Sequence, residues 1–266
     1  MNSTHLISIV GAGPGDPELL TVKAYRRLTG ADIILYDALL GGEILELAGA
    51  KALKIYAGKH CQDGQQQTER QDNINQQLKL YAREGKKVVR LKAGDPFIFG
   101  RGAEELQFCL SERLNVEVIP GITAGMAAAS SFHIPVTLRG MNSMALFYTG
   151  HKRNGGFADI SVAAEVLKTG APVIVYMGLK NLIVLANQLL EAGLPIDIQV
   201  QIASLVGHKQ QKLYSTNLGQ VEVFLQQNYP PMPAVIILGK YAAEIVPGQL
   251  KGEPVFNSVI CSGHLE

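Results

Sequence analysis

What the sequence has little of narrows its class before any motif is considered. It has no tryptophan, and its three cysteines (Cys61, Cys109 and Cys261) lack CxxC spacing. A zinc site or a disulfide scaffold is therefore not expected, and a reducing compartment is the natural environment. The longest apolar runs, such as Ala171 to Met177, are far shorter than a membrane span. The first residues have no basic flank for a signal peptide, so we expect a cytoplasmic protein with no membrane partner and no metal.

Charge is also scarce, since charged residues make up 18% of the chain and the formal net charge is +1. The net charge therefore gives no indication of nucleic acid as a partner, and an anionic substrate would have to be bound by a local group of basic residues. In contrast, 47% of the 266 residues are hydrophobic. That fraction supports a full core in one large or two medium domains.

Apolar, β-branched runs alternate with helical patterns in the first half of the chain. The strands expected there are Leu6–Val10, Ile33–Tyr36, Leu53–Tyr56, Val88–Leu91 and Val116–Ile119. Asp16-Pro17 predicts the start of a helix that runs through Leu28, and helical spacing predicts another over Thr68–Glu84. Strands that alternate with helices in this way predict a mostly parallel sheet.

A second series of elements begins after a pause near Arg139. Its expected strands are Met144–Thr149, Val173–Tyr176, Val200–Ala203, Leu213–Ser215 and Val235–Leu238, and its expected helices are Val162–Lys168, Leu182–Glu191 and Leu218–Gln227. Gly207-His208-Lys209 separates two short strands and predicts a hairpin, hence a mixed sheet. We therefore predict an α/β fold with α/β domains at 1–139 and 140–246 and a weakly periodic tail at 247–266.

Three loops rich in glycine and proline follow predicted strands. They begin at Gly11, Gly94 and Pro120. Because the carboxyl edge of an open α/β sheet is where ligands bind, three such loops predict a shared ligand site. Asp95 in the second loop is either an Asx-turn residue or an acceptor for a ligand. Thr123-Ala124 in the third loop opens a helix whose free N–H groups could hold a carboxylate.

The first loop also invites a dinucleotide-binding interpretation. It follows a strand and opens a helix, and Asp37 ends the next strand at about the spacing of an NAD site. The third glycine of that motif is replaced by Asp16, whose carboxylate would oppose a pyrophosphate at the helix terminus. An NAD-dependent oxidoreductase is therefore disfavoured, and a tight turn with an N-cap explains Asp16 equally well.

Charged side chains at strand ends have two interpretations each. Asp37 either caps a turn or serves as a general base, and Lys59 is either a solvated lysine or a proton donor. Arg101 and Arg139 are either ordinary surface charges or forks for a polycarboxylate, and His151 is either a turn residue or a ligand contact. Met177, which ends an apolar strand, is either core or a soft wall for a sulfur-containing ligand.

With these motifs in place, the chain resembles the tetrapyrrole methylases over about residues 6 to 240. The most specific part runs from Arg90 to Glu105 and contains Gly94-Asp95-Pro96-Phe97 and Gly100-Arg101-Gly102. The resemblance implies two α/β domains, usually in a homodimer, with S-adenosylmethionine folded in the cleft between them. It assigns contacts with this methyl donor to Pro14, Ala93, Gly94, Asp95, Ile98, Thr123, Ala124 and Met177.

The resemblance is nearest to the family members that methylate uroporphyrinogen III. It implies that two ring carbons are methylated to give precorrin-2, for sirohaem or cobalamin, with Asp37 as proton acceptor and Lys59 as donor. It assigns the substrate contacts to Arg101, Arg139 and His151. Methyl transfer from a sulfonium needs positioning and a base rather than a metal. Ala93 and Leu138 replace the family's usual Gly and His, and a later precorrin methylase or a non-catalytic tetrapyrrole carrier are the alternatives.

Overall fold

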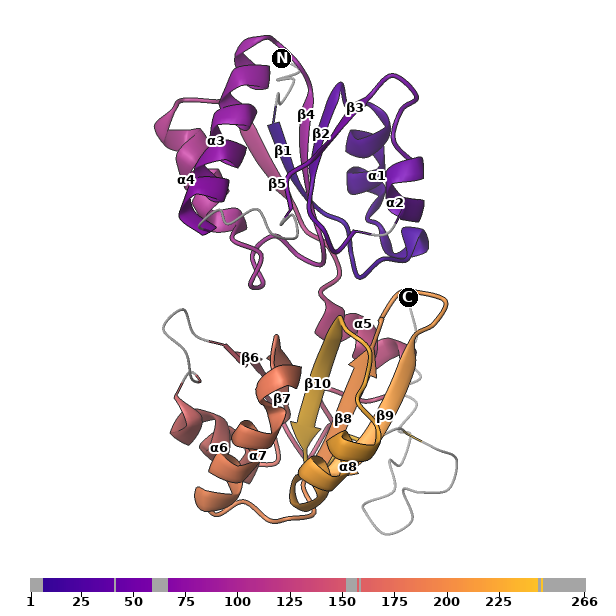
Figure 1. The fold of residues 1–266 in the computed structure, drawn as a ribbon, viewed down its shortest axis with the longest axis vertical. Coiled ribbons are helices and arrows are strands. Elements are labelled where there is room, and N and C mark those ends of the chain that lie inside the picture. The colour runs from indigo at the N-terminus through magenta and orange to yellow at the C-terminus, as the bar shows by residue number, and fades with distance from the viewer. Residues whose placement is uncertain are drawn as a thin grey trace, which may run out of the picture.

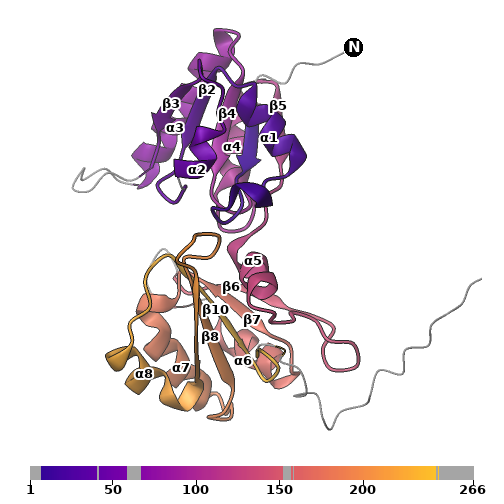
Figure 2. The same cartoon turned by 90° about the vertical axis from the view of Figure 1, so that its right-hand side faces the viewer.

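The computed structural model describes residues 7–40, 42–58, 67–151, 157, 159–243 and 245. Two five-stranded sheets, each covered by helices, form an upper and a lower half in Figures 1 and 2. The predicted fold class, with a parallel first sheet and a mixed second sheet, is confirmed. Within the described ranges, no helix has the length and apolar character needed to cross a membrane.

The first sheet has the order β3-β2-β4-β1-β5, and all its strand pairs are parallel. Its strands are β1 (Ile7–Gly11), β2 (Ile33–Tyr36), β3 (Leu53–Tyr56), β4 (Val88–Lys92) and β5 (Val116–Ile119). Helices α1 (Val22–Thr29) and α2 (Gly42–Glu46) pack on one face, and α3 (Gln67–Arg83) and α4 (Gly102–Ser111) pack on the other. This double cover explains why every residue of β1 and β4 is buried.

The second sheet has the order β6-β7-β10-β8-β9, in which only β6 and β7 pair in parallel. Its strands are β6 (Leu146–Thr149), β7 (Val173–Tyr176), β8 (Gln199–Ser204), β9 (Lys212–Asn217) and β10 (Ala234–Gly239). Helices α6 (Ile160–Lys168), α7 (Leu182–Glu191) and α8 (Val221–Gln227) share one core with it. The predicted hairpin is confirmed as the antiparallel pair β8 and β9.

Helix α5 (Ala124–Ser131) covers the opposite face of the second sheet. Its alanines share a core with Ile174, Ala203 and Val235. By its packing, therefore, α5 belongs with the second sheet, although it precedes Arg139 in the sequence. The predicted domain boundary at residue 139 stays a prediction. The tail predicted at 247–266 lies outside the described residues.

The continuous helix predicted from Asp16 through Leu28 is wrong. A 3-10 helix covers Pro17–Leu19, Leu20 is extended, and α1 begins only at Val22. Two side chains compete for the start: Asp16 accepts from Glu18 N at 2.8 Å, and Thr21 accepts from Ala24 N at 3.1 Å. Since each cap closes its own turn, the chain breaks between them.

Candidate functional site

The three glycine loops meet at one edge of the first sheet, as their strand ends predict. Gly94 N donates to Gly13 O at 2.7 Å, and Gly13 N donates back to Gly94 O at 3.2 Å. A Cβ atom on Gly121 would lie 2.3 Å from Gly94 O and 2.8 Å from Gly11 Cα. Only glycine permits this approach of three backbones, so the loops form one continuous surface.

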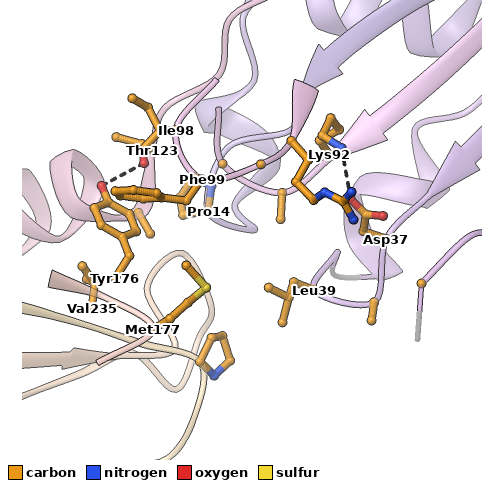
Figure 3. Close-up of a pocket in the computed structure, with 18 of the residues that line it drawn as sticks. Pro14, Asp37, Leu39, Lys92, Ile98, Phe99, Thr123, Tyr176, Met177 and Val235 are labelled. Atoms are coloured by element: carbon orange, nitrogen blue, oxygen red, sulfur yellow. Dashed lines mark hydrogen bonds and ion pairs between the residues drawn. The ribbon is translucent and has the colours of Figure 1, made fainter. Parts of the chain in front are cut away.

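A pocket of about 820 Å³ lies between this surface and the second half of the chain (Figure 3). The predicted site residues that line it are Pro14, Asp37, Ala93, Gly94, Ile98, Arg101, Thr123, Ala124 and Met177. They come from both halves of the molecule and from the crossing between them. The strand-end loops thus border one cavity, and ligand binding in it stays a prediction.

Three predicted site residues within the described ranges, Asp95, Arg139 and His151, are not part of this lining. Lys59 lies outside the described residues. The carboxylate of Asp95 accepts from Phe97 N at 2.8 Å and from Gly121 N at 3.1 Å. It therefore fastens the second loop to the third, and its direct contact with a ligand stays a prediction.

Arg139 and His151 are exposed and are not among the residues that line the pocket. His151 lies in a turn, in which its backbone N donates to Thr149 Oγ1 at 3.4 Å. Their contact with a substrate also stays a prediction.

Tyr176, from the end of β7, forms a wall that joins the two halves. Its hydroxyl is 2.9 Å from Thr123 Oγ1 and accepts from Gly125 N at 3.1 Å. Its ring centroid is 5.2 Å from that of Phe99, which belongs to the loop after β4. Burial raises the pKa of Tyr176, so the hydroxyl stays protonated and available as a donor.

Three residues that line the pocket have left-handed backbone conformations unusual for side chains other than glycine. They are Phe99 (φ 54°), Arg101 (φ 60°) and Met177 (φ 56°). Such conformations cost free energy and cluster where a protein shapes a ligand site. The Met177 side chain is 55% exposed, and Figure 3 shows it directed into the cavity. The soft-wall interpretation of Met177 is therefore favoured over a place in the core.

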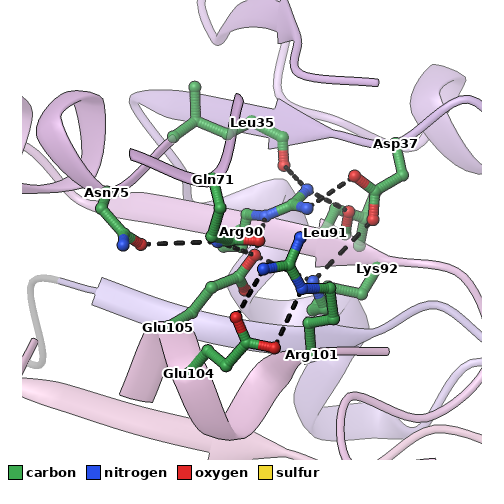
Figure 4. Close-up of polar contacts among 10 residues, drawn as sticks. All are labelled: Leu35, Asp37, Gln71, Asn75, Arg90, Leu91, Lys92, Arg101, Glu104 and Glu105. Atoms are coloured by element: carbon green, nitrogen blue, oxygen red, sulfur yellow. Dashed lines mark hydrogen bonds and ion pairs between the residues drawn. The ribbon is translucent and has the colours of Figure 1, made fainter. Parts of the chain in front are cut away.

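The other end of the pocket is charged (Figure 4). Arg90 Nη2 donates to Asp37 Oδ1 at 2.5 Å, and Lys92 Nζ lies 3.9 Å from Asp37 Oδ2. The Arg90 and Lys92 side chains are 2% and 3% exposed, whereas that of Asp37 is 30% exposed. Asp37 is thus the accessible edge of a buried cluster and faces the cavity.

Glu105, from α4, completes this cluster from behind. Its Oε1 atom accepts from Arg90 Nε at 3.0 Å and from Lys92 Nζ at 2.9 Å. Burial, reinforced by the charge of Arg90, lowers the pKa of Lys92. Burial acts in the same direction on Arg90, but Glu105 and Asp37 more than offset it, so the pKa of Arg90 is raised.

Five further residues of the site have no role predicted from the sequence: Arg90, Lys92, Glu105, Phe99 and Tyr176. A signal existed for the first two, because residues 90 and 92 interrupt an apolar strand with two cations two positions apart. That spacing places both on one face of a buried strand, where they need partners. Tyr176 and Phe99 carried no comparable signal, since an aromatic residue at the end of an apolar strand is ordinary core and one in a glycine-rich loop has no fixed partner.

Chemically, the pocket combines backbone-rich loops and a soft apolar wall at one end with a carboxylate backed by two cations at the other. In the ranges that the structure describes, no group of three or more His, Cys, Asp or Glu side chains could hold a metal ion. The Asp16 carboxylate caps the turn where a dinucleotide pyrophosphate would have to lie. These features favour a polar organic ligand with an apolar sulfur-containing portion over NAD.

Comparison with known proteins agrees with this chemistry. Residues 6–222 match the family model of the Tetrapyrrole (Corrin/Porphyrin) Methylases. The chain is 48% identical over 189 residues to uroporphyrinogen-III C-methyltransferase of Bacillus subtilis, covering 70% of this chain and 71% of that protein. It is 39% identical to the chloroplastic S-adenosyl-L-methionine-dependent uroporphyrinogen III methyltransferase of Arabidopsis thaliana, over 88% of this chain. The chain spans 63% of the Arabidopsis protein and 48% of a similar siroheme synthase of Nitrosospira multiformis.

Solved structures show the same fold. Uroporphyrin-III C-methyl transferase from Thermus thermophilus, complexed with S-adenyl homocysteine, superposes with a TM-score of 0.75 at 34% identity, covering 88% of this chain and 97% of that one. A cobalt precorrin-4 methyltransferase superposes with a TM-score of 0.77 at 23% identity, covering 90% of this chain and 97% of that one, a likeness that extends to the fold alone.

Proposed function

Because the chain belongs to the tetrapyrrole (corrin/porphyrin) methylase family, we propose that it transfers methyl groups from S-adenosylmethionine to two ring carbons of uroporphyrinogen III. The product would be precorrin-2, for sirohaem or cobalamin. The observation that carries this proposal is the cavity itself, in which strand-end loops of one half face the Met177 wall of the other. The 48% identity to a uroporphyrinogen-III C-methyltransferase supports this choice over a later precorrin methylase.

The residues present fit S-adenosylmethionine. Gly94 is held at φ 66° beside the Thr123 backbone, which leaves the floor of the pocket without side-chain bulk. Ala124 begins α5, in which Gly125 N donates to Tyr176 and Met126 N to Thr123 O, so the Ala124 N–H is the first-turn donor suited to a ligand carboxylate. Met177 offers a polarisable surface to a sulfonium. When bound, the donor supplies an electrophilic methyl group. The chain's own task is to hold the acceptor carbon in line and to exclude water.

Asp37 is the residue that we propose as proton acceptor after methyl transfer. It is the accessible carboxylate of the charged cluster, and Arg90 fixes its orientation. Removal of a ring proton restores conjugation in the methylated macrocycle, and a carboxylate held at the pocket surface is equipped to take it. We propose Lys59 as the matching donor on the resemblance alone.

The substrate carries eight carboxylates, which basic residues at the pocket would receive. Arg101 lines the pocket, as do Arg70 of α3 and Lys180 of the second half. We include Arg139 and His151 as further contacts on the resemblance alone. We also propose that the protein is cytoplasmic and works as a homodimer. Sedimentation analysis of the purified chain would test the homodimer.

Two measurements test the proposed function together. Calorimetry should show binding of S-adenosylhomocysteine and none of NAD; binding of NAD without any response to the homocysteine analogue would reject the proposal. Anaerobic incubation with uroporphyrinogen III and methyl-labelled donor should then yield a product carrying two labels. Binding of tetrapyrrole without turnover would identify a carrier, and turnover of later precorrins alone would move the chain to another step.

A further inference from the structure

Glu105 is a buried carboxylate that is not itself among the residues lining the pocket, yet it contacts both cations beside Asp37, Arg90 and Lys92, which do line it. Its side chain is fully buried, and one oxygen, Oε1, accepts from Arg90, Lys92 and Gln71. The last of these bonds, from Gln71 Nε2 at 3.2 Å, ties α4 to α3. Glu105 therefore links the helix behind the second glycine loop to the strand that presents the cluster.

The charges of the cluster balance only when Glu105 is counted. Arg90 and Lys92 are both buried, and Asp37 alone would neutralise one of them. Without Glu105 the two cations would repel each other, and both would compete for the Asp37 carboxylate. With it, Arg90 is held at its Nε atom by Glu105 and is free to present Nη2 to Asp37.

Stability alone is a weak reason for such a cluster. Buried ion pairs often contribute no more than apolar side chains of similar volume. In the described part of the chain, Glu105 Oε2 is also buried without a hydrogen-bond partner, which costs further free energy. Asp37, Arg90, Lys92 and Gln71 all line the cavity, and Asp37 is the most exposed of the charged residues, so the cluster faces the pocket.

We propose that Glu105 is a positioning residue that sets Arg90 and Lys92 against Asp37 and so fixes the carboxylate at the surface of the pocket. The proposal rests on the proposed function, in which Asp37 takes a proton from the methylated ring. Glu105 does not contact substrate or donor. It acts by holding the two cations that orient the group which does.

The groups that face Lys92 determine how the cluster responds to pH. They are Arg90 on the same strand, Asp37 after β2 and Glu105 on α4. Two further titratable side chains lie nearby: Cys109 on α4, whose pKa is raised in part by the charge of Glu105, and Arg70 on α3, which lines the same pocket. Glu105 and Asp37 raise the pKa of Lys92, against burial and Arg90. Loss of Glu105 would therefore lower that pKa further and neutralise Lys92 at a lower pH.

Glu105→Gln tests the proposal, because glutamine keeps the shape and one acceptor while removing the charge. We expect kcat to fall tenfold or more, since a displacement of about 1 Å at a reacting group can cost about 10²-fold. The KM for uroporphyrinogen III and the affinity for S-adenosylhomocysteine should change less than about threefold. The alkaline limb of the kcat profile should move to lower pH.

Glu117→Gln is the matched control. Glu117 is also a buried glutamate bonded to two cations, Arg27 and Lys23, but it lies on β5, outside the pocket lining. This variant should lose stability and keep both kcat and the pH profile. Equal effects of the two variants on kcat, or a Glu105→Gln enzyme with an unchanged kcat and profile, would overturn the proposal.

The double variant Glu105→Gln/Lys92→Gln guards against failure to fold, because it restores the charge balance of the cluster. It should fold and should still have a low kcat; a double variant as active as the wild type would overturn the proposal. An NMR titration of the Lys92 ammonium needs no turnover. A lowered pKa in Glu105→Gln supports the proposal even if the wild type fails to methylate uroporphyrinogen III, and an unchanged pKa contradicts it.

Discussion

Gly121→Ala offers the sharpest test of how the loops build the pocket. The added Cβ would lie 2.3 Å from Gly94 O and 2.7 Å from Gly11 C, all backbone atoms that cannot rotate away. Comfortable contact requires about 3.4 Å, so the loops would have to separate by about 1 Å. Gly121 is not in the left-handed region, so the effect of the substitution is the clash alone.

We expect this overpacking to destabilise the protein by about 1–3 kcal/mol in urea unfolding. Because the same loops form the floor of the pocket, the affinity for S-adenosylhomocysteine in calorimetry should fall at least about tenfold, which corresponds to about 1.4 kcal/mol. Gly42→Ala is the control, since nothing lies within 4 Å of its added Cβ at the start of α2. It should leave affinity unchanged, and a Gly121→Ala protein with wild-type stability and affinity would refute the close approach of the three loops.

The other predictions concern single side chains. Asp37→Ala should slow methyl transfer at least about tenfold, measured well below the melting transition because loss of a carboxylate partner of buried Arg90 also lowers stability; an unchanged rate would remove Asp37 from the mechanism. Tyr176→Phe deletes the hydroxyl between Thr123 and Gly125, so unfolding titrations should show a loss of about 1 kcal/mol and calorimetry a weaker response to S-adenosylhomocysteine. Hydrogen bonds from its partners hold the pKa of Glu117 at about 2 despite burial, so its stabilisation is complete above pH 4.5 and is lost as the pH falls toward 2. Glu117→Gln should cost about 1–3 kcal/mol near neutral pH and flatten that acid dependence; a variant with the wild-type acid profile would contradict it.

The loops could be located from the sequence because glycines after apolar strands indicate tight turns or close approaches of the backbone. Gly11, Gly94 and Gly121 follow apolar strands, and parallel strands end at a common edge. Which half of the chain faces that edge could not be deduced, because it depends on α5 packing against the second sheet rather than the first. Because most residues of α5 are apolar, its sequence has no amphipathic pattern that would indicate which of the two sheets it packs against.

Side-chain partnerships were the least accessible to sequence reasoning. Asp95 has two plausible uses in any strand-end loop, and only its bond to Gly121 N, 26 residues away, shows that it fastens two loops. Likewise, Asp37 was weighed as a cap or a base, whereas its ion pair with Arg90 depends on the neighbouring places of β2 and β4 in the sheet. A Thr21 cap at the true start of α1 was present in the sequence, but the stronger Asp16-Pro17 signal before it concealed it.

A crystal structure of the chain with S-adenosylhomocysteine tests the central claim most directly. We expect the ligand in the cavity between the two halves, with its sulfur beside Met177 and its contacts on Pro14, Gly94 and Thr123. Ligand bound at any other surface, with this cavity holding only solvent, would contradict it.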